Sequence, residues 1–132
     1  MTRPPLELWC RYNRGWLRPD GIIHIVAGAG MPSPDYAYTG ADALAAQQVG
    51  LLLAAGKPYP VVGDMRSVQR ARPDARRVQP PPLVSALAII VESPVTRMLA
   101  NAYLGITRPK QPTRVFTGLD AAVNWLHQHT LD

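Results

Sequence analysis

Residues 83–91 read LVSALAIIV and form the most apolar strand candidate in the chain. The run ends at Glu92-Ser93-Pro94, where Ser93 is typical of a helix N-cap and Pro94 of a first helical position. The spacing of apolar residues after Pro94 predicts an amphipathic helix over residues 95–104. A buried strand that leads into a helix is the repeating unit of an α/β domain, so this stretch indicates that class.

The same alternation of strands and helices continues on both sides of this stretch. The predicted strands are residues 22–27, 59–65, 83–91 and 113–116, and the predicted helices are residues 41–55, 73–78, 95–104 and 119–129. Thr39 or Asp42 is a candidate cap for the first of these helices. Because helical crossovers join parallel strands, the order predicts a largely parallel sheet covered by helices.

The N-terminal residues predict an antiparallel addition to that sheet. Residues 6–12 alternate large and polar side chains, Asn13-Arg14-Gly15 is typical of a turn, and residues 16–18 follow as a second strand. We therefore predict an α/β fold with a single mixed, largely parallel sheet, an N-terminal antiparallel hairpin and helices covering it. A chain of 132 residues suits one domain, here 1–132, with the hairpin at 6–18 and the α/β body at 22–129.

Composition excludes several classes of protein. The hydrophobic fraction of 47% supports a packed core, and one cysteine excludes a disulfide scaffold. No apolar run approaches the roughly 20 residues of a membrane helix, and residues 1–7 lack the apolar stretch of a signal peptide. We expect a cytoplasmic protein without membrane insertion. The net charge of +5 is not accompanied by a nucleic-acid-binding motif, so we expect no nucleic acid partner.

Candidate catalytic and cofactor sites are weak. Gly28-Ala29-Gly30 follows a strand, but Ser33 occupies the place of the third glycine of a dinucleotide fingerprint, so no cofactor is expected. His24, His127 and His129 do not have the spacing of metal ligands. The serines and glutamates do not form a nucleophile or acid–base motif, so we expect no catalytic residue, no metal and no enzyme activity.

Arginines gather in one short segment, which we call the arginine segment (residues 66–77). Its basic residues are Arg66, Arg70, Arg72, Arg76 and Arg77. Guanidinium groups suit bidentate contact with carboxylates, so the segment predicts a binding surface for an acidic protein partner. The alternative is a solvated surface in which the arginines pair locally with Asp64 and Asp74.

Five stretches in series resemble the STAS family: VVGDMRSV at 61–68, ALAIIV at 86–91, NAYLG at 101–105, VFT at 115–117 and AAVNWL at 121–126. The family includes sulfate-transporter tails and anti-sigma-factor antagonists, and the chain is most similar to its SpoIIAA-like bacterial members. The resemblance covers roughly residues 22–126. It implies a small regulatory or scaffold domain that binds a protein and has no catalytic chemistry.

The resemblance also implies a phosphorylation site, from which this sequence departs. Anti-sigma-factor antagonists of the family carry a phosphate-accepting serine in an Asp-Ser-Ser-Gly loop, and the corresponding residues 70–76 here read RARPDAR. No serine or threonine is present in that stretch, and Ser67 lies earlier in the loop. The usual phosphorylation switch is therefore not expected.

Two further hypotheses concern the aromatic residues. Tyr36 and Tyr38 lie in the loop 28–40 and are candidates to close a pocket for a small apolar ligand or lipid, or simply to pack the loop. The N-terminal hairpin carries Trp9, Tyr12 and Trp16 and is an edge element, so it is a candidate homodimer interface. The alternative is that these aromatic rings cover the sheet of their own chain.

Overall fold

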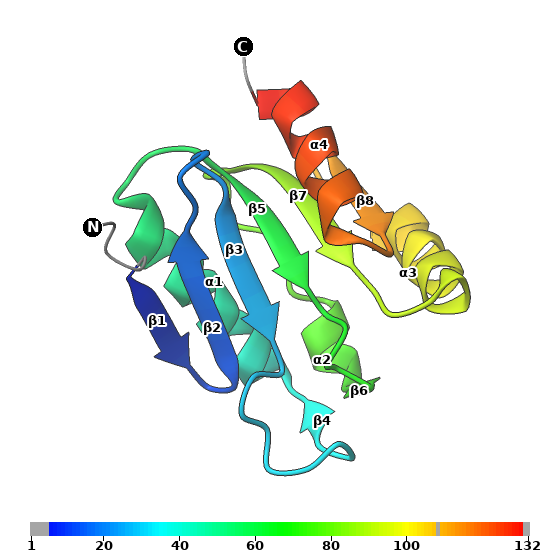
Figure 1. The fold of residues 1–132 in the computed structure, drawn as a ribbon. Coiled ribbons are helices and arrows are strands. Elements are labelled where there is room, and N and C mark those ends of the chain that lie inside the picture. The colour runs from blue at the N-terminus through cyan, green and yellow to red at the C-terminus, as the bar shows by residue number, and fades with distance from the viewer. Residues whose placement is uncertain (1–5, 108, 131–132) are drawn as a thin grey trace.

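The computed structural model describes residues 6–107 and 109–130, in which six strands form one mixed sheet (Figure 1). These strands are β1 (Glu7–Cys10), β2 (Asn13–Leu17), β3 (Ile23–Ala27), β5 (Tyr59–Asp64), β7 (Val84–Ile90) and β8 (Thr113–Phe116). They lie in the order β1-β2-β3-β5-β7-β8. The first two pairings are antiparallel and the other three are parallel. The predicted fold class is therefore confirmed.

Helices cover both faces of the sheet (Figure 1). They are α1 (Gly40–Ala54), α2 (Pro73–Arg76), α3 (Pro94–Thr107) and α4 (Leu119–Thr130). On one face α4 packs Leu126 against Val62 and Ile90 of the central strands. On the other face α1 packs near Ile25. Each strand contributes to both faces because its successive side chains point to opposite sides of the sheet. None of the helices in the described residues has the length and apolar character needed to cross a bilayer.

The first turn of α1 is closed by two reciprocal hydrogen bonds. Thr39 is the N-cap, and its Oγ1 accepts a hydrogen bond from the backbone N–H of Asp42 at 3.1 Å. The carboxylate of Asp42 accepts in turn from the backbone N–H of Thr39 at 2.9 Å. Both residues proposed as caps from the sequence therefore act together, in a capping box.

The hairpin turn lies two residues earlier than the sequence predicted. Arg11 and Tyr12 form the turn, with φ angles of 43° and 64°, and Asn13 begins β2. The expectation of a turn at Asn13-Arg14-Gly15 is wrong because Asn13 is fully buried and its amide donates to the carbonyl oxygens of Cys10, Arg11 and Asp42. Two residues of positive φ match the twist of an antiparallel hairpin.

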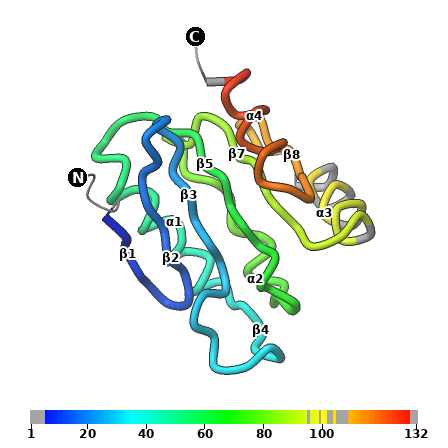
Figure 2. The backbone as a smooth tube through the Cα atoms, in the orientation of Figure 1, coloured from blue at the N-terminus to red at the C-terminus, as the bar shows by residue number. Residues whose placement is uncertain are grey.

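A second, small sheet was not predicted. β4 (Ala37–Tyr38) pairs in parallel with β6 (Arg70–Ala71). Figure 2 shows that the two long loops carrying them come together at the end of the main sheet where β3 and β5 finish. Each strand has only two residues, too few for a sequence pattern to indicate a strand.

Candidate functional site

Three contacts hold the arginine segment against β4 and the start of α1. Ala71 pairs with Tyr38 in the small sheet, and the backbone N–H of Arg72 donates to the carbonyl oxygen of Tyr38 at 2.8 Å. The carboxylate of Asp74 accepts from the backbone N–H of Gly40 at 3.1 Å. A segment that reads as a loop in sequence therefore has a defined position beside the first turn of α1.

Arg66 is engaged within the chain. Its guanidinium donates to both carboxylate oxygens of Asp64, at 2.9 and 2.7 Å, and its backbone N–H donates to the same group at 3.0 Å. Burial by itself raises the pKa of Asp64, but the hydrogen bonds and charge of Arg66 outweigh it, and the net pKa is below the ordinary value. Of the predicted binding residues, Arg66 thus forms the local Arg–Asp pair considered as the alternative.

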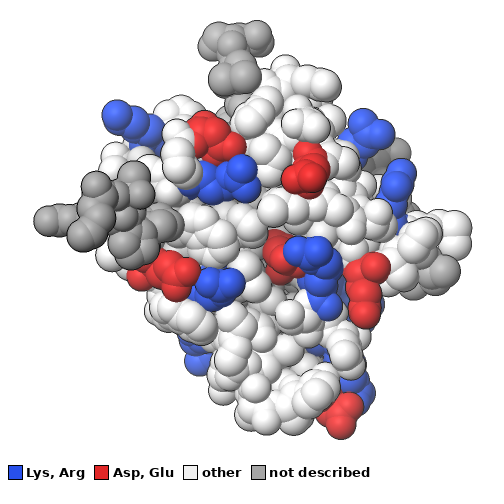
Figure 3. All heavy atoms as spheres, viewed as in Figure 1, with Lys and Arg blue, Asp and Glu red and all other residues white. Residues whose placement is uncertain are grey.

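The other four arginines of the segment differ from Arg66, because in the described part of the chain none of them forms an ion pair. Arg70, Arg72, Arg76 and Arg77 are all exposed, and within the described residues no carboxylate lies at ion-pair distance from them. Asp74, which the sequence offered as a partner, is used by α1 instead. On the face of the molecule in Figure 3, basic and acidic side chains are mixed in small groups and do not form one basic field.

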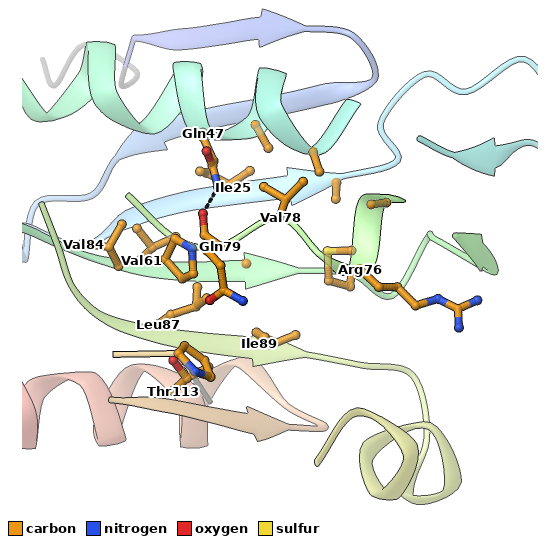
Figure 4. Close-up of a pocket in the computed structure, with 18 of the residues that line it drawn as sticks. Ile25, Gln47, Val61, Arg76, Val78, Gln79, Val84, Leu87, Ile89 and Thr113 are labelled. Carbon is orange, nitrogen blue, oxygen red and sulfur yellow. Dashed lines mark hydrogen bonds between the residues drawn. The ribbon is translucent and has the colours of Figure 1, made fainter. Parts of the chain in front are cut away.

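An apolar cavity of about 310 Å³ lies beside the arginine segment (Figure 4). Its floor is the sheet, with Ile25, Val61, Leu87 and Ile89. Other walls come from α1, from the proline-containing stretch 78–81 and from α3. The cavity exists because α1 covers β2 and β3 and α3 covers β8, which leaves the middle of this face open.

The two tyrosines proposed as pocket residues have different positions. Tyr38 is buried and lines the cavity, and its hydroxyl donates to Asn13 Oδ1. Tyr36 is not among the lining residues, and its hydroxyl donates to the carboxylate of Asp42 at 2.7 Å. Tyr36 also packs edge-on against Tyr12, with 5.0 Å between ring centroids.

Sequence reasoning missed most of the cavity. The lining residues Val61 and Gly63 on β5, and Leu87 and Ile89 on β7, alternate along their strands, so a shared face could have been inferred from period two. No local signal in the sequence indicates that the middle of this face, over β5 and β7, lacks a covering helix. The wall formed by residues 78–81 also depends on the position of a loop.

Among the residues that the structure describes, histidine and acidic side chains do not form a metal site. Within residues 6–107 and 109–130, no three His, Cys, Asp or Glu side chains meet at one point. His24 is buried and stacks on Trp16 with 4.2 Å between ring centroids. Burial lowers the pKa of His24.

Comparisons with known proteins give one matching family and similar solved structures. The family described as Domain of unknown function (DUF7793) matches residues 15–130. An uncharacterized protein of the DUF3478 family from Shewanella loihica PV-4, with a SpoIIAA-like fold, has 12% identity and a TM-score of 0.59 over 96% of this chain and 99% of that one. A protein of unknown function from Arthrobacter sp. FB24 has 30% identity and a TM-score of 0.32 over 85% of this chain and 96% of that one.

The search of curated proteins finds no match. At 12% identity the Shewanella structure shows the fold alone, and that fold is SpoIIAA-like. The predicted SpoIIAA-like architecture is thereby confirmed. The matching family is not STAS, so membership in STAS stays a prediction.

Proposed function

The chain belongs to the family described as Domain of unknown function (DUF7793), and we propose that it is a non-catalytic binding domain whose arginine segment captures an acidic protein partner. The observation that carries the proposal is the group of four exposed arginines, Arg70, Arg72, Arg76 and Arg77, with no carboxylate at ion-pair distance in the described chain. The resemblance to STAS regulatory domains supports the same class of function.

The backbone of the arginine segment is held in one conformation, which favours binding by its side chains. Pairing of β6 with β4 and the hydrogen bond from Gly40 to Asp74 hold the backbone of the segment in place. A fixed backbone reduces the conformational entropy lost when the side chains bind. Guanidinium groups on such a backbone suit bidentate contact with Asp and Glu side chains of a partner.

Charge reversal of Arg70, Arg72 and Arg76 to glutamate is expected to abolish partner capture. The three substitutions turn attraction for an acidic surface into repulsion, which costs several kcal/mol at an interface. The measurement is a pull-down from cell lysate with tagged wild-type and variant chains, followed by identification of the captured proteins by mass spectrometry.

A matched control reverses Lys57, Lys110 and Arg114, which are exposed, lie outside the segment and give the same change in net charge. We expect this control to capture the same acidic proteins as the wild type. Undiminished capture by the variant in the arginine segment would show that the partner binds elsewhere.

We also propose that residues 1–132 act as one domain in the cytoplasm. Support for one domain comes from the shared sheet, because the hairpin strand β2 pairs directly with β3 of the α/β body. The exposed thiol of Cys10, the one cysteine of the chain, would stay reduced in that compartment.

Self-association through the edge strand β1 is expected to give a homodimer. β1 pairs on one side only, with β2, and carries Trp9 with 61% of its surface exposed beside Leu6 with 72%. Light scattering coupled to size-exclusion chromatography should give twice the chain mass, and Trp9→Lys should give a monomer. A wild-type monomer at high concentration would exclude this interface.

A second candidate function is the binding of a small apolar ligand, and the cavity beside Tyr38 is the observation that favours it. Its volume of about 310 Å³ falls within the range of roughly 300–1,000 Å³ found for small-molecule sites. Native mass spectrometry of protein purified without denaturation should detect a ligand bound to the chain. A mass equal to that of the polypeptide alone would count against this candidate.

A further inference from the structure

The cavity follows the strands of the sheet. Along β7 its floor extends from Val84 to Ile89, which is about 16 Å at a rise of roughly 3.3 Å per residue. Gly63 on the neighbouring strand β5 has no side chain, and a Cβ placed there would meet nothing nearer than 4.0 Å. An extended apolar group therefore matches the floor of the cavity.

Most polar groups of the lining are already used inside the protein. Gln47 donates to the carbonyl oxygen of Gln79, and the Thr113 hydroxyl donates to that of Gln111 at 3.0 Å. The hydroxyl of Tyr38 donates to Asn13. These groups are neutral and engaged, so the body of the cavity offers little to a polar ligand.

Arg76 is the one charged side chain among the described lining residues. One of its terminal nitrogens donates to the carbonyl oxygen of Ala71 at 2.9 Å, and no carboxylate of the described chain lies at ion-pair distance. Figure 4 shows its guanidinium at one end of the cavity, turned away from the apolar lining. One end of the apolar cavity is thus bordered by the Arg76 side chain, with its guanidinium in the solvent just beyond that end.

We propose that this cavity binds a single-chain amphiphile with an anionic head, an inference that rests on the second candidate function. The alkyl tail lies along β5 and β7, and the removal of its apolar surface from water drives binding. The head lies at Arg76, whose guanidinium has N–H groups left to donate to a carboxylate or a phosphate.

Calorimetric titration of the full chain with dodecanoate, dodecyl phosphate and dodecanol tests the head group. We expect both anions to bind with one molecule per chain and about tenfold more tightly than dodecanol, the ratio for one charge-assisted hydrogen bond. The stronger of the two anions identifies the head as a carboxylate or a phosphate.

Two neighbouring arginine variants locate the head. Arg76→Gln should weaken binding of the anions about tenfold and leave dodecanol unchanged. Arg77→Gln is the matched control, because Arg77 is exposed, lies outside the lining and loses the same charge. Equal losses in the two variants would overturn the role of Arg76.

A series at Gly63 locates the tail. Gly63→Ala should change the affinities less than twofold, whereas Gly63→Leu fills the floor and should weaken binding of all three ligands more than tenfold. Thermal denaturation confirms that each variant is folded. Unchanged binding by a folded Gly63→Leu variant would overturn the site.

The outcomes separate this inference from the proposed functions. Equal affinities for dodecanol and the anions would overturn the anionic head, and failure of all three to bind would overturn the amphiphile. In either case the second candidate still stands or falls on native mass spectrometry. Partner capture by the arginine segment is decided separately by the charge-reversal pull-down.

Discussion

Replacement of Asp42 by alanine is expected to lower the free energy of unfolding by about 3 kcal/mol. The Asp42 side chain is fully buried, and its carboxylate accepts hydrogen bonds from the Thr39 backbone, the Tyr36 hydroxyl and Arg11 Nε. Alanine removes all three acceptor contacts at once, so the Thr39 backbone N–H, the Tyr36 hydroxyl and Arg11 Nε lose their acceptor and half of the capping box is lost. Equilibrium unfolding in urea measures the loss.

Asp74→Ala is the matched control for this prediction. Asp74 also accepts from the backbone at the start of α1, but its side chain is exposed, so water can replace it and the loss should be below about 1 kcal/mol. Similar losses in the two variants would mean that burial of Asp42 contributes little.

The contribution of Asp42 should depend on pH in a defined direction. Burial raises the pKa of Asp42, but hydrogen bonds from Thr39, Tyr36 and Arg11 outweigh it, and the net pKa is lowered. The stabilisation is therefore present above the unfolded pKa of about 3.9 and is lost as pH falls through the lower folded value. The difference in unfolding free energy between wild type and Asp42→Asn should shrink below about pH 4.

Gly15→Val is expected to lower the free energy of unfolding by about 2–3 kcal/mol, although valine favours strands. A Cβ at Gly15 would lie 2.7 Å from Val49 Cγ1 of α1 and 3.1 Å from the carbonyl oxygen of His24. Neither the strand backbone nor the packed helix can move freely, so the added atoms separate α1 from the sheet. Thermal and urea denaturation measure the effect.

Gly63→Val provides the comparison within the same sheet. Gly15 and Gly63 both pair with Ile25, on either side of it, so a side chain introduced at either position would lie on the same face of the sheet. The nearest atoms to a Cβ at Gly63 are 4.0 Å away, and strand propensity should stabilise the fold by up to about 1 kcal/mol. A higher melting temperature for Gly15→Val than for wild type would contradict the close packing of α1.

Long periodic elements were predictable from sequence. The strand at residues 113–116 has the predicted bounds, β7 is one residue shorter than predicted at each end, and α4 is one residue longer at its C-terminal end. These elements were predictable because the spacing of their apolar residues along the chain indicates which side chains are buried. The candidate site was predictable only in part, because the arginines are adjacent in sequence whereas the cavity lining is not.

The amino-acid sequence alone predicts the order of the helices and of the strands in the main sheet, the largely parallel pairing and the concentration of arginines at residues 66–77. Contacts between distant segments establish that β4 pairs with β6, that Asp74 accepts from the backbone of Gly40, and that the floor around Gly63 stays open. The difference arises from how far along the chain each interaction reaches. Periodicity, caps and charge runs act between residues a few positions apart, whereas a cavity and a free charge depend on what distant segments cover.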